Sequence, residues 1–212
     1  MKGKIIYIDE DPEDIIYFQD FIDGHFDLEV IEITNGVLLN DVVDEILSSP
    51  PDAIITDFLL NEKARVSFNG QALIESIQHR NKHIPCFLLT SHAPDALTAT
   101  HDARLVQSKA VLLGGNSISD LKSLFRIQIA KVIETYKESY RKAVDEIDAL
   151  SAETPQNLTA IQRQRLVELD DYIESFGLSS HQVPSALKED KSIELLTQLI
   201  SSVDDLIART KK

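Results

Sequence analysis

The first 118 residues alternate short apolar runs with stretches of helical periodicity. The apolar runs predict β-strands at residues 4–8, 28–34, 53–56 and 86–89, and a fifth within AVLLGG, residues 110–115. Helices are predicted between them, one capped by Asp11 that runs from Pro12 to Gly24, and one over residues 37–48 before two prolines. Strands separated by helices form a parallel sheet covered on both faces. We therefore predict an α/β fold with a doubly wound five-stranded parallel sheet.

From Ser119 onward the strand pattern stops and apolar residues recur every three or four positions, which is typical of amphipathic helices. The first stripe comprises Phe125, Ile129, Val132, Tyr136, Tyr140, Ala143, Ile147 and Leu150. A second helix is expected after Thr154-Pro155, with its stripe ending before Gly177, and a third after LKED, residues 187–190. We therefore predict a domain over residues 1–128 and a C-terminal helical region over residues 129–212. Its first helix is continuous with the last helix of the domain, and its helices either close into a bundle or form a coiled-coil homodimer.

Composition narrows the class of protein. Hydrophobic residues make up 43% and charged residues 26% of the chain, as in ordinary globular proteins. The formal net charge is -14, which disfavours nucleic acid as a partner because an acidic surface repels phosphate backbones. No apolar run reaches the roughly 18 to 20 residues of a membrane span, and the start MKGKIIYIDE lacks the pattern of a signal peptide. We expect a cytoplasmic protein that makes no membrane contact.

Two predicted strands end in acidic residues. The first ends at Asp9 and Glu10, and the third ends at Asp57. These strands are neighbours in a doubly wound sheet, so the three carboxylates should converge at one edge. Magnesium accepts carboxylate oxygens while keeping some of its waters, and it would cancel the repulsion among them. We therefore predict Mg²⁺ as cofactor, with the hydroxyl of Thr90 on the same rim.

With these residues the sequence resembles the receiver domain of two-component response regulators over roughly residues 1–128. The resemblance is carried by IDEDP, PDAIITD, FNG before the third helix and LLTS. It implies a flavodoxin-like fold in which Asp57 is the phosphoacceptor and Thr90 the switch hydroxyl. It also implies that Asp9, Glu10, Asp57 and the backbone carbonyl of Leu59 hold Mg²⁺, and that a histidine kinase or phosphotransfer protein is the partner.

Receivers carry a lysine at the end of the fifth strand, and two positions compete for that place. The spacing to the following helix favours Gly114, which would leave the lysine missing; Lys109 is the alternative. In the register that favours Gly114, Lys109 lies about 16 Å from the end of the fifth strand, at roughly 3.3 Å per residue. That is too far for direct contact with a phosphoryl group. Val111 then replaces the usual inward aromatic residue, and in the other register Val106 does.

The segment FLLNEKARVSFNG, residues 58–70, is longer than receivers usually have. It contains Lys63 and Arg65, and either cation could fold back over a phosphate. A solvated loop is the favoured interpretation.

The main hypothesis is a phosphoacceptor signalling protein rather than an enzyme. A kinase would pass a phosphoryl group to Asp57, and the helical tail would bind a protein effector; otherwise the chain would act as a phosphoryl shuttle or sink. One alternative is a pseudo-receiver, a binding module that keeps the fold and has lost phosphotransfer. The apparent replacement of the receiver lysine by Gly114 favours this alternative.

A second alternative is a phosphatase of the haloacid dehalogenase type. In such an enzyme Asp9 would be the nucleophile and Asp11 the general acid, with Thr90 and Lys109 as later motifs. Pro12 breaks the usual continuation of the first motif, and no strand pattern follows residue 118 to supply the last one.

Overall fold

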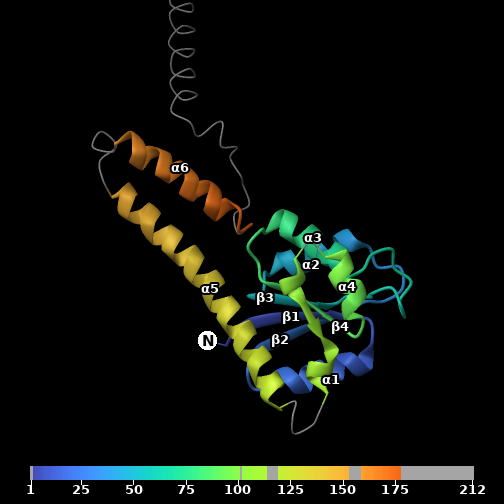
Figure 1. Cartoon of the computed structure of the whole chain (residues 1–212). Helices are drawn as coiled ribbons and strands as arrows, with labels where there is room; N and C mark the ends of the chain where they lie inside the picture. The colour runs from blue at the N-terminus through green and yellow to red at the C-terminus, as the bar shows by residue number, and fades with distance from the viewer. Residues whose placement is uncertain (1, 101, 114–118, 153–158, 178–212) are drawn as a thin grey trace, which may run out of the picture. The chain divides into compact units, whose positions relative to one another are not determined.

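The computed structural model describes residues 2–100, 102–113, 119–152 and 159–177 (Figure 1). The strands are β1 (Lys4–Asp9), β2 (Asp27–Glu32), β3 (Ala53–Asp57), β4 (Cys86–Thr90) and β5 (Val106–Ser108). The α-helices are α1 (Pro12–Ile22), α2 (Leu39–Ser48), α3 (Gly70–Arg80), α4 (Ala93–Ala99), α5 (Ser119–Ser151) and α6 (Ala160–Glu174). Two 3₁₀ turns, η1 (Ala103–Leu105) and η2 (Lys109–Leu112), flank β5.

The strands form one five-stranded sheet in the order β2-β1-β3-β4-β5, and every pairing is parallel. Because the order reverses after β1, the sheet is doubly wound, with its ligand-binding crevice at the carboxyl ends of β1 and β3. The predicted fold class is confirmed.

Side-chain alternation along the strands divides the core into two layers. In β1, Ile6 and Ile8 pack in one hydrophobic cluster with residues of α2 and α3, whereas Ile5 and Tyr7 pack in another with residues of α1 and α5. Figure 1 shows α2 and α3 on one side of the sheet and α1 on the other. Both faces are covered, which explains why the buried strands are apolar nearly throughout.

Helix α1 begins as its sequence indicates. The Asp11 carboxylate accepts a hydrogen bond from the backbone N–H of Glu13 at 3.1 Å, and Pro12 occupies the first turn. The helix ends at Ile22, two residues before Gly24, which has a positive φ of 73°. Asp11 therefore turns the chain directly from the end of β1 into α1.

Helix α5 covers the sheet through a stripe with a spacing of four residues. Phe125, Ile129 and Ile133 are buried against the cluster that contains Ile5. Val132, which was predicted to lie on the apolar stripe, is 36% exposed, and Ile133 occupies the buried position instead. Each such side chain contributes about 1.5–3 kcal/mol when fully buried.

The fifth strand lies earlier than the sequence indicates. It was expected within residues 110–115, but β5 spans Val106–Ser108, and the apolar residues that follow form η2, whose Leu112 packs in the core. As an edge strand, β5 pairs only with β4, so it needs less apolar character than the central strands. The prediction followed the stronger apolar run and was wrong.

Two compact units divide between Tyr140 and Arg141, within α5. The expected boundary at residue 128 also falls inside this helix. In the second unit, Arg165 of α6 makes two hydrogen bonds to Glu146, of 2.7 and 2.9 Å. Thr159 caps α6. Thr154-Pro155 and the third predicted helix lie outside the described residues.

None of the helices in the described part of the chain combines the length and apolar character needed to cross a bilayer.

Candidate functional site

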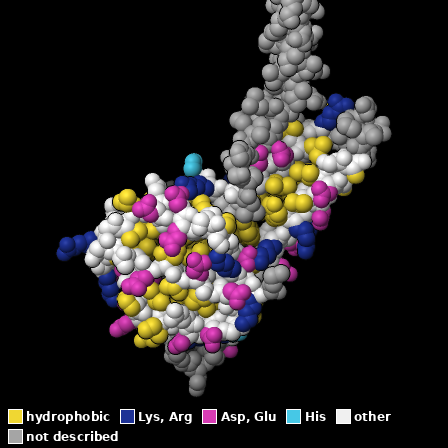
Figure 2. Space-filling model, turned by 180° about the vertical axis from the view of Figure 1, so that it is seen from behind, with side chains coloured by type: hydrophobic (Ala, Val, Ile, Leu, Met, Phe, Trp, Pro, Cys, Tyr) yellow, Lys and Arg dark blue, Asp and Glu magenta, His cyan; other side chains and the backbone are white. Residues whose placement is uncertain are grey.

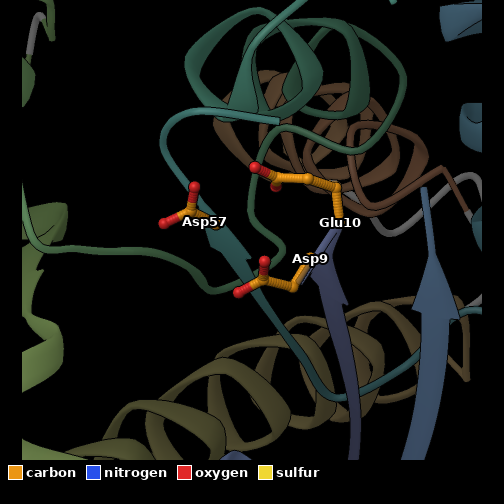
Figure 3. A group of neighbouring side chains, drawn as sticks. All are labelled: Asp9, Glu10 and Asp57. Carbon is orange, nitrogen blue, oxygen red and sulfur yellow. The ribbon is translucent and has the colours of Figure 1, made fainter. Parts of the chain in front are cut away.

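The three predicted carboxylates converge at the carboxyl edge of the sheet. Asp9 ends β1, Glu10 follows it, and Asp57 ends the neighbouring strand β3. Each offers an oxygen that lies within 4.8 Å of the others, and Figure 3 shows the side chains of Asp9 and Asp57 projecting from adjacent strand ends, with Glu10 beside them. All are buried, Asp9 completely. Their juxtaposition follows from the strand order.

Lys109 supplies the positive charge that these carboxylates require. Its ammonium nitrogen lies 2.8 Å from Asp57 Oδ1, 2.9 Å from Asp9 Oδ2 and 2.6 Å from Asp14 Oδ2. Although burial disfavours its charge, Asp57 and Asp9 raise the pKa of Lys109 above its ordinary value. The ammonium is therefore charged and joins three acidic side chains.

The register that favoured Gly114 placed Lys109 too far from the end of the fifth strand. Lys109 directly follows β5 and contacts Asp57, instead of lying about 16 Å from the strand end. The error came from placing β5 too late. Gly114 lies outside the described residues. Val106, which the alternative register matched to the inward aromatic position, is partly buried against the core.

Burial raises the pKa of two of the three carboxyls in this pocket. Burial, together with the negative charges of Asp9 and Asp57, raises the pKa of Glu10 to about 7. Burial also raises the pKa of Asp57, and Lys109 only partly offsets this. The oxygen Glu10 Oε2 is buried without a hydrogen-bond partner among the described residues. An unsatisfied buried carboxylate oxygen beside two further acids is the kind of group that a hard cation satisfies, so the residues fit Mg²⁺.

The backbone around Asp57 holds its carboxylate in place. Asp57 Oδ2 accepts a hydrogen bond from the N–H of Leu59 at 2.7 Å. The role expected of the Leu59 carbonyl remains a prediction. A Cβ atom on Gly70 would lie 1.9 Å from the backbone oxygen of Asp57, so only glycine permits α3 to begin this close to the strand end. Gly70 is the last residue of the FNG motif.

Two residues at the site were not singled out from the sequence. Tyr7 lies beneath Asp9 in β1, and its hydroxyl donates a hydrogen bond to Asp9 Oδ2 at 2.5 Å. Asp14, in the first turn of α1, accepts a hydrogen bond from Lys109. Tyr7 had the pattern of a core residue and Asp14 that of a helix N-terminal acid. A tyrosine two residues before the acid in a buried strand was the available signal, because its hydroxyl must find a partner when buried.

Thr90 is fully buried at the end of β4, as predicted for the rim. Its hydroxyl accepts a hydrogen bond from the N–H of His92 at 2.9 Å. The neighbouring residues Ser91 and His92 line the cavity in front of Asp57.

That cavity has a volume of about 200 Å³. Its lining includes Asp57 and Lys109, and also Lys63 of the long loop between β3 and α3. Lys63 forms an ion pair with Asp11. The favoured interpretation of this loop as merely solvated was therefore incomplete, because one of its two cations reaches the pocket.

No protein-family model matches the chain. A search of curated proteins finds no match either. Several of the solved structures that resemble it are described as response regulators or receiver domains. One is a two-component response regulator of the LuxR family from Aurantimonas sp. SI85-9A1, 14% identical, with a TM-score of 0.47 and coverage of 62% of this chain and 87% of that one.

Another is the signal receiver domain of an HD domain-containing protein from Pseudomonas fluorescens Pf-5, 12% identical, with a TM-score of 0.49 and coverage of 66% and 93%. A third is a response regulator receiver protein from Sinorhizobium medicae WSM419, 12% identical, with a TM-score of 0.47 and coverage of 64% and 97%. At identities this low the likeness concerns the fold alone. Function has to be argued from the residues of the site.

Proposed function

We propose that the unit preceding residue 141 is a response-regulator receiver that accepts a phosphoryl group on Asp57 with the help of Mg²⁺. The observation that carries this proposal is the convergence of Asp9, Glu10 and Asp57 with the ammonium of Lys109 in one buried pocket. A purely structural cluster of buried acids would be costly, because burial penalises each charge. A pocket that must bind a dication requires such acids, and the bound dication together with Lys109 would stabilise a transferred phosphoryl group.

The transfer is a substitution at phosphorus. An oxygen of the Asp57 carboxylate attacks the phosphorus of an acyl phosphate or a phosphohistidine, and the new P–O bond gives an aspartyl phosphate. The bond from phosphorus to the donor breaks, and the electron pair leaves with the carboxylate or imidazole of the donor. Lys109 contacts Asp57 Oδ1 in the unphosphorylated protein and would neutralise charge on the transferred group.

Asp9, Glu10 and Asp57 would hold Mg²⁺, with the Leu59 carbonyl as a further ligand. The metal would supply charge neutralisation and orient the phosphoryl oxygens. Hydrogen bonds from Tyr7 and Lys109 to one oxygen of Asp9 hold this carboxylate in position for the metal.

Thr90 would report phosphorylation by turning toward the new group. Its hydroxyl accepts a hydrogen bond from a backbone N–H, and it can rotate to donate to a phosphoryl oxygen instead. This is the switch role that the family resemblance implies.

Protein partners fit the surface better than nucleic acid. The net charge is -14, and on the face in Figure 2 acidic side chains are interspersed with basic ones. On α5, Leu121, Leu124 and Ile127 are 53%, 60% and 65% exposed. Exposed apolar side chains close together favour a protein contact. A histidine kinase or phosphotransfer protein would supply the phosphoryl group, and the C-terminal helices would bind an effector or a second copy of the chain.

The phosphoacceptor claim is tested by incubating the full chain with Mg²⁺ and acetyl phosphate and measuring the intact mass. We expect one added phosphoryl group on the wild type and on Asp20→Asn, a matched change on an exposed residue of α1. We expect none on Asp57→Asn or when Mg²⁺ is chelated. An unmodified wild type would favour the pseudo-receiver, and equal modification of Asp57→Asn would contradict the role of Asp57 as the acceptor.

The phosphatase alternative has weaker support. A general acid at Asp11 must be free to give a proton, yet its carboxylate caps α1 and pairs with Lys63, which together hold the pKa of Asp11 below its usual value. Turnover that survives Asp57→Ala and is lost in Asp9→Ala would reverse this ranking.

A further inference from the structure

The loop between β3 and α3, residues 58–69, is anchored beside the phosphoryl pocket. Leu60, Ala64 and Phe68 are buried in the core. The backbone N–H of Arg65 donates to Asn35 Oδ1 at 2.7 Å, which ties the loop to the segment after β2. Because buried residues lie on both sides of Lys63, the backbone that carries it is held in position.

The side chain of Lys63 has more freedom than its backbone. It is 57% exposed, and it lines the same cavity as Asp57 and Lys109. Its ammonium forms an ion pair with Asp11. Exposed pairs of this kind contribute little stability, so exchanging one anionic partner for another costs little. A lysine side chain also has four flexible carbon–carbon bonds over which to reorient.

The charges around the cavity leave a place for a second cation. Five acidic side chains line it, namely Glu10, Asp11, Asp14, Asp57 and Glu62, against Lys63 and Lys109. Lys109 already contacts three carboxylates at 2.6 to 2.9 Å. A doubly charged phosphoryl group entering this pocket meets an acidic wall, and Lys63 is the lining ammonium that is not buried among carboxylates.

We propose that Lys63 is a second phosphoryl-binding cation, which leaves Asp11 when a phospho-donor enters and binds the phosphoryl oxygens opposite Lys109. This inference rests on the proposed function of Asp57. Asp11 then serves as the resting partner of Lys63 and keeps its ammonium at the mouth of the cavity.

The test uses two variants that break the same ion pair and separate its two possible roles. Lys63→Gln removes the cation. Asp11→Asn leaves it free, and asparagine still caps α1. The full chain is phosphorylated with acetyl phosphate and Mg²⁺ over a range of donor concentrations. We expect Lys63→Gln to raise the half-saturating donor concentration about tenfold, the size of one lost charge-assisted hydrogen bond.

We expect Lys63→Arg to stay close to wild type, and Asp11→Asn to leave the half-saturating concentration equal or lower. Arg65→Gln is the charge control, because it removes one positive charge from the same loop at a residue that does not line the cavity. If Lys63→Gln and Asp11→Asn both raise the value, the pair only tethers the loop and the inference is wrong. A shift of equal size in Arg65→Gln also overturns it, since the effect would then be one of net charge.

A second measurement uses beryllium fluoride, a phosphoryl mimic that carries no acyl group. With Mg²⁺ it should raise the thermal unfolding midpoint of wild type and Asp11→Asn, and raise that of Lys63→Gln less. An equal rise in Lys63→Gln contradicts the role of Lys63. A wild type that takes no phosphoryl group removes the proposed function itself, whereas a phosphorylated wild type with an unchanged Lys63→Gln removes only this inference.

Discussion

Replacing Lys109 with methionine tests whether one buried ammonium holds the acidic pocket together. The side chain of Lys109 is 11% exposed, and those of Asp9 and Asp57, which it contacts at 2.9 and 2.8 Å, are 0% and 7% exposed. Removing one partner of a buried ion pair costs about 3–5 kcal/mol, because the remaining charge stays buried without compensation. Methionine keeps most of the apolar stem, so the loss would report the charge.

We expect the free energy of unfolding of Lys109→Met to fall by about 3 kcal/mol at pH 8, the lower end of that range. A protein of ordinary stability, about 5–15 kcal/mol, still folds after this loss. The measurement is urea unfolding followed by circular dichroism in a chelator. The matched control is Lys131→Met, which removes an exposed ion pair with Glu134 and should leave the midpoint unchanged.

Mg²⁺ should restore much of the lost stability, because a dication placed among the carboxylates replaces the missing positive charge. A midpoint of Lys109→Met that equals the wild-type midpoint in the chelator would refute the account of this pocket.

Three further changes probe the same edge of the sheet. The pKa of Glu10 is raised from 4.5 to about 7, so the folded state binds more protons in that window and stability without metal should fall as pH rises through it. Glu10→Gln should show a smaller fall when urea midpoints are compared at pH 5 and 8, and a fall equal to that of the wild type would contradict this reasoning. Gly70→Ala should lower the free energy of unfolding by about 1–3 kcal/mol and slow phosphoryl uptake, since its Cβ meets the backbone of Asp57. Stability and uptake equal to those of the wild type would count against this prediction. Tyr7→Phe should lose about 1.5–3 kcal/mol in urea unfolding through the missing hydrogen bond to Asp9, and an unchanged midpoint would show that the bond contributes nothing.

The sheet and its acidic edge were predictable because both follow from periodicity. Central strands are buried on both faces, so their apolar runs are plain in the sequence, and the positions of Asp9 and Asp57 at neighbouring strand ends follow from the strand order. The cap at Asp11 was predictable for a similar local reason. These features depend on residues within one element or on the order of elements.

The place of Lys109 was not predictable in the same way. Edge strand β5 has only three residues and a single neighbour, so its sequence carries little apolar signal, while the stronger run after it forms a 3₁₀ turn. Long-range contacts were also missed. The ion pair between Lys109 and Asp14 and the ion pair between Lys63 and Asp11 depend on side chains meeting across elements, which periodicity does not encode.

The most direct test of the central claim locates the phosphoryl group on the chain. After incubation with acetyl phosphate and Mg²⁺, borohydride reduction converts an aspartyl phosphate to homoserine, and peptide mass spectrometry identifies the reduced position. We predict homoserine at position 57, only when Mg²⁺ is present. Homoserine at another aspartate, or none in a folded protein with Mg²⁺, would contradict the role assigned to Asp57.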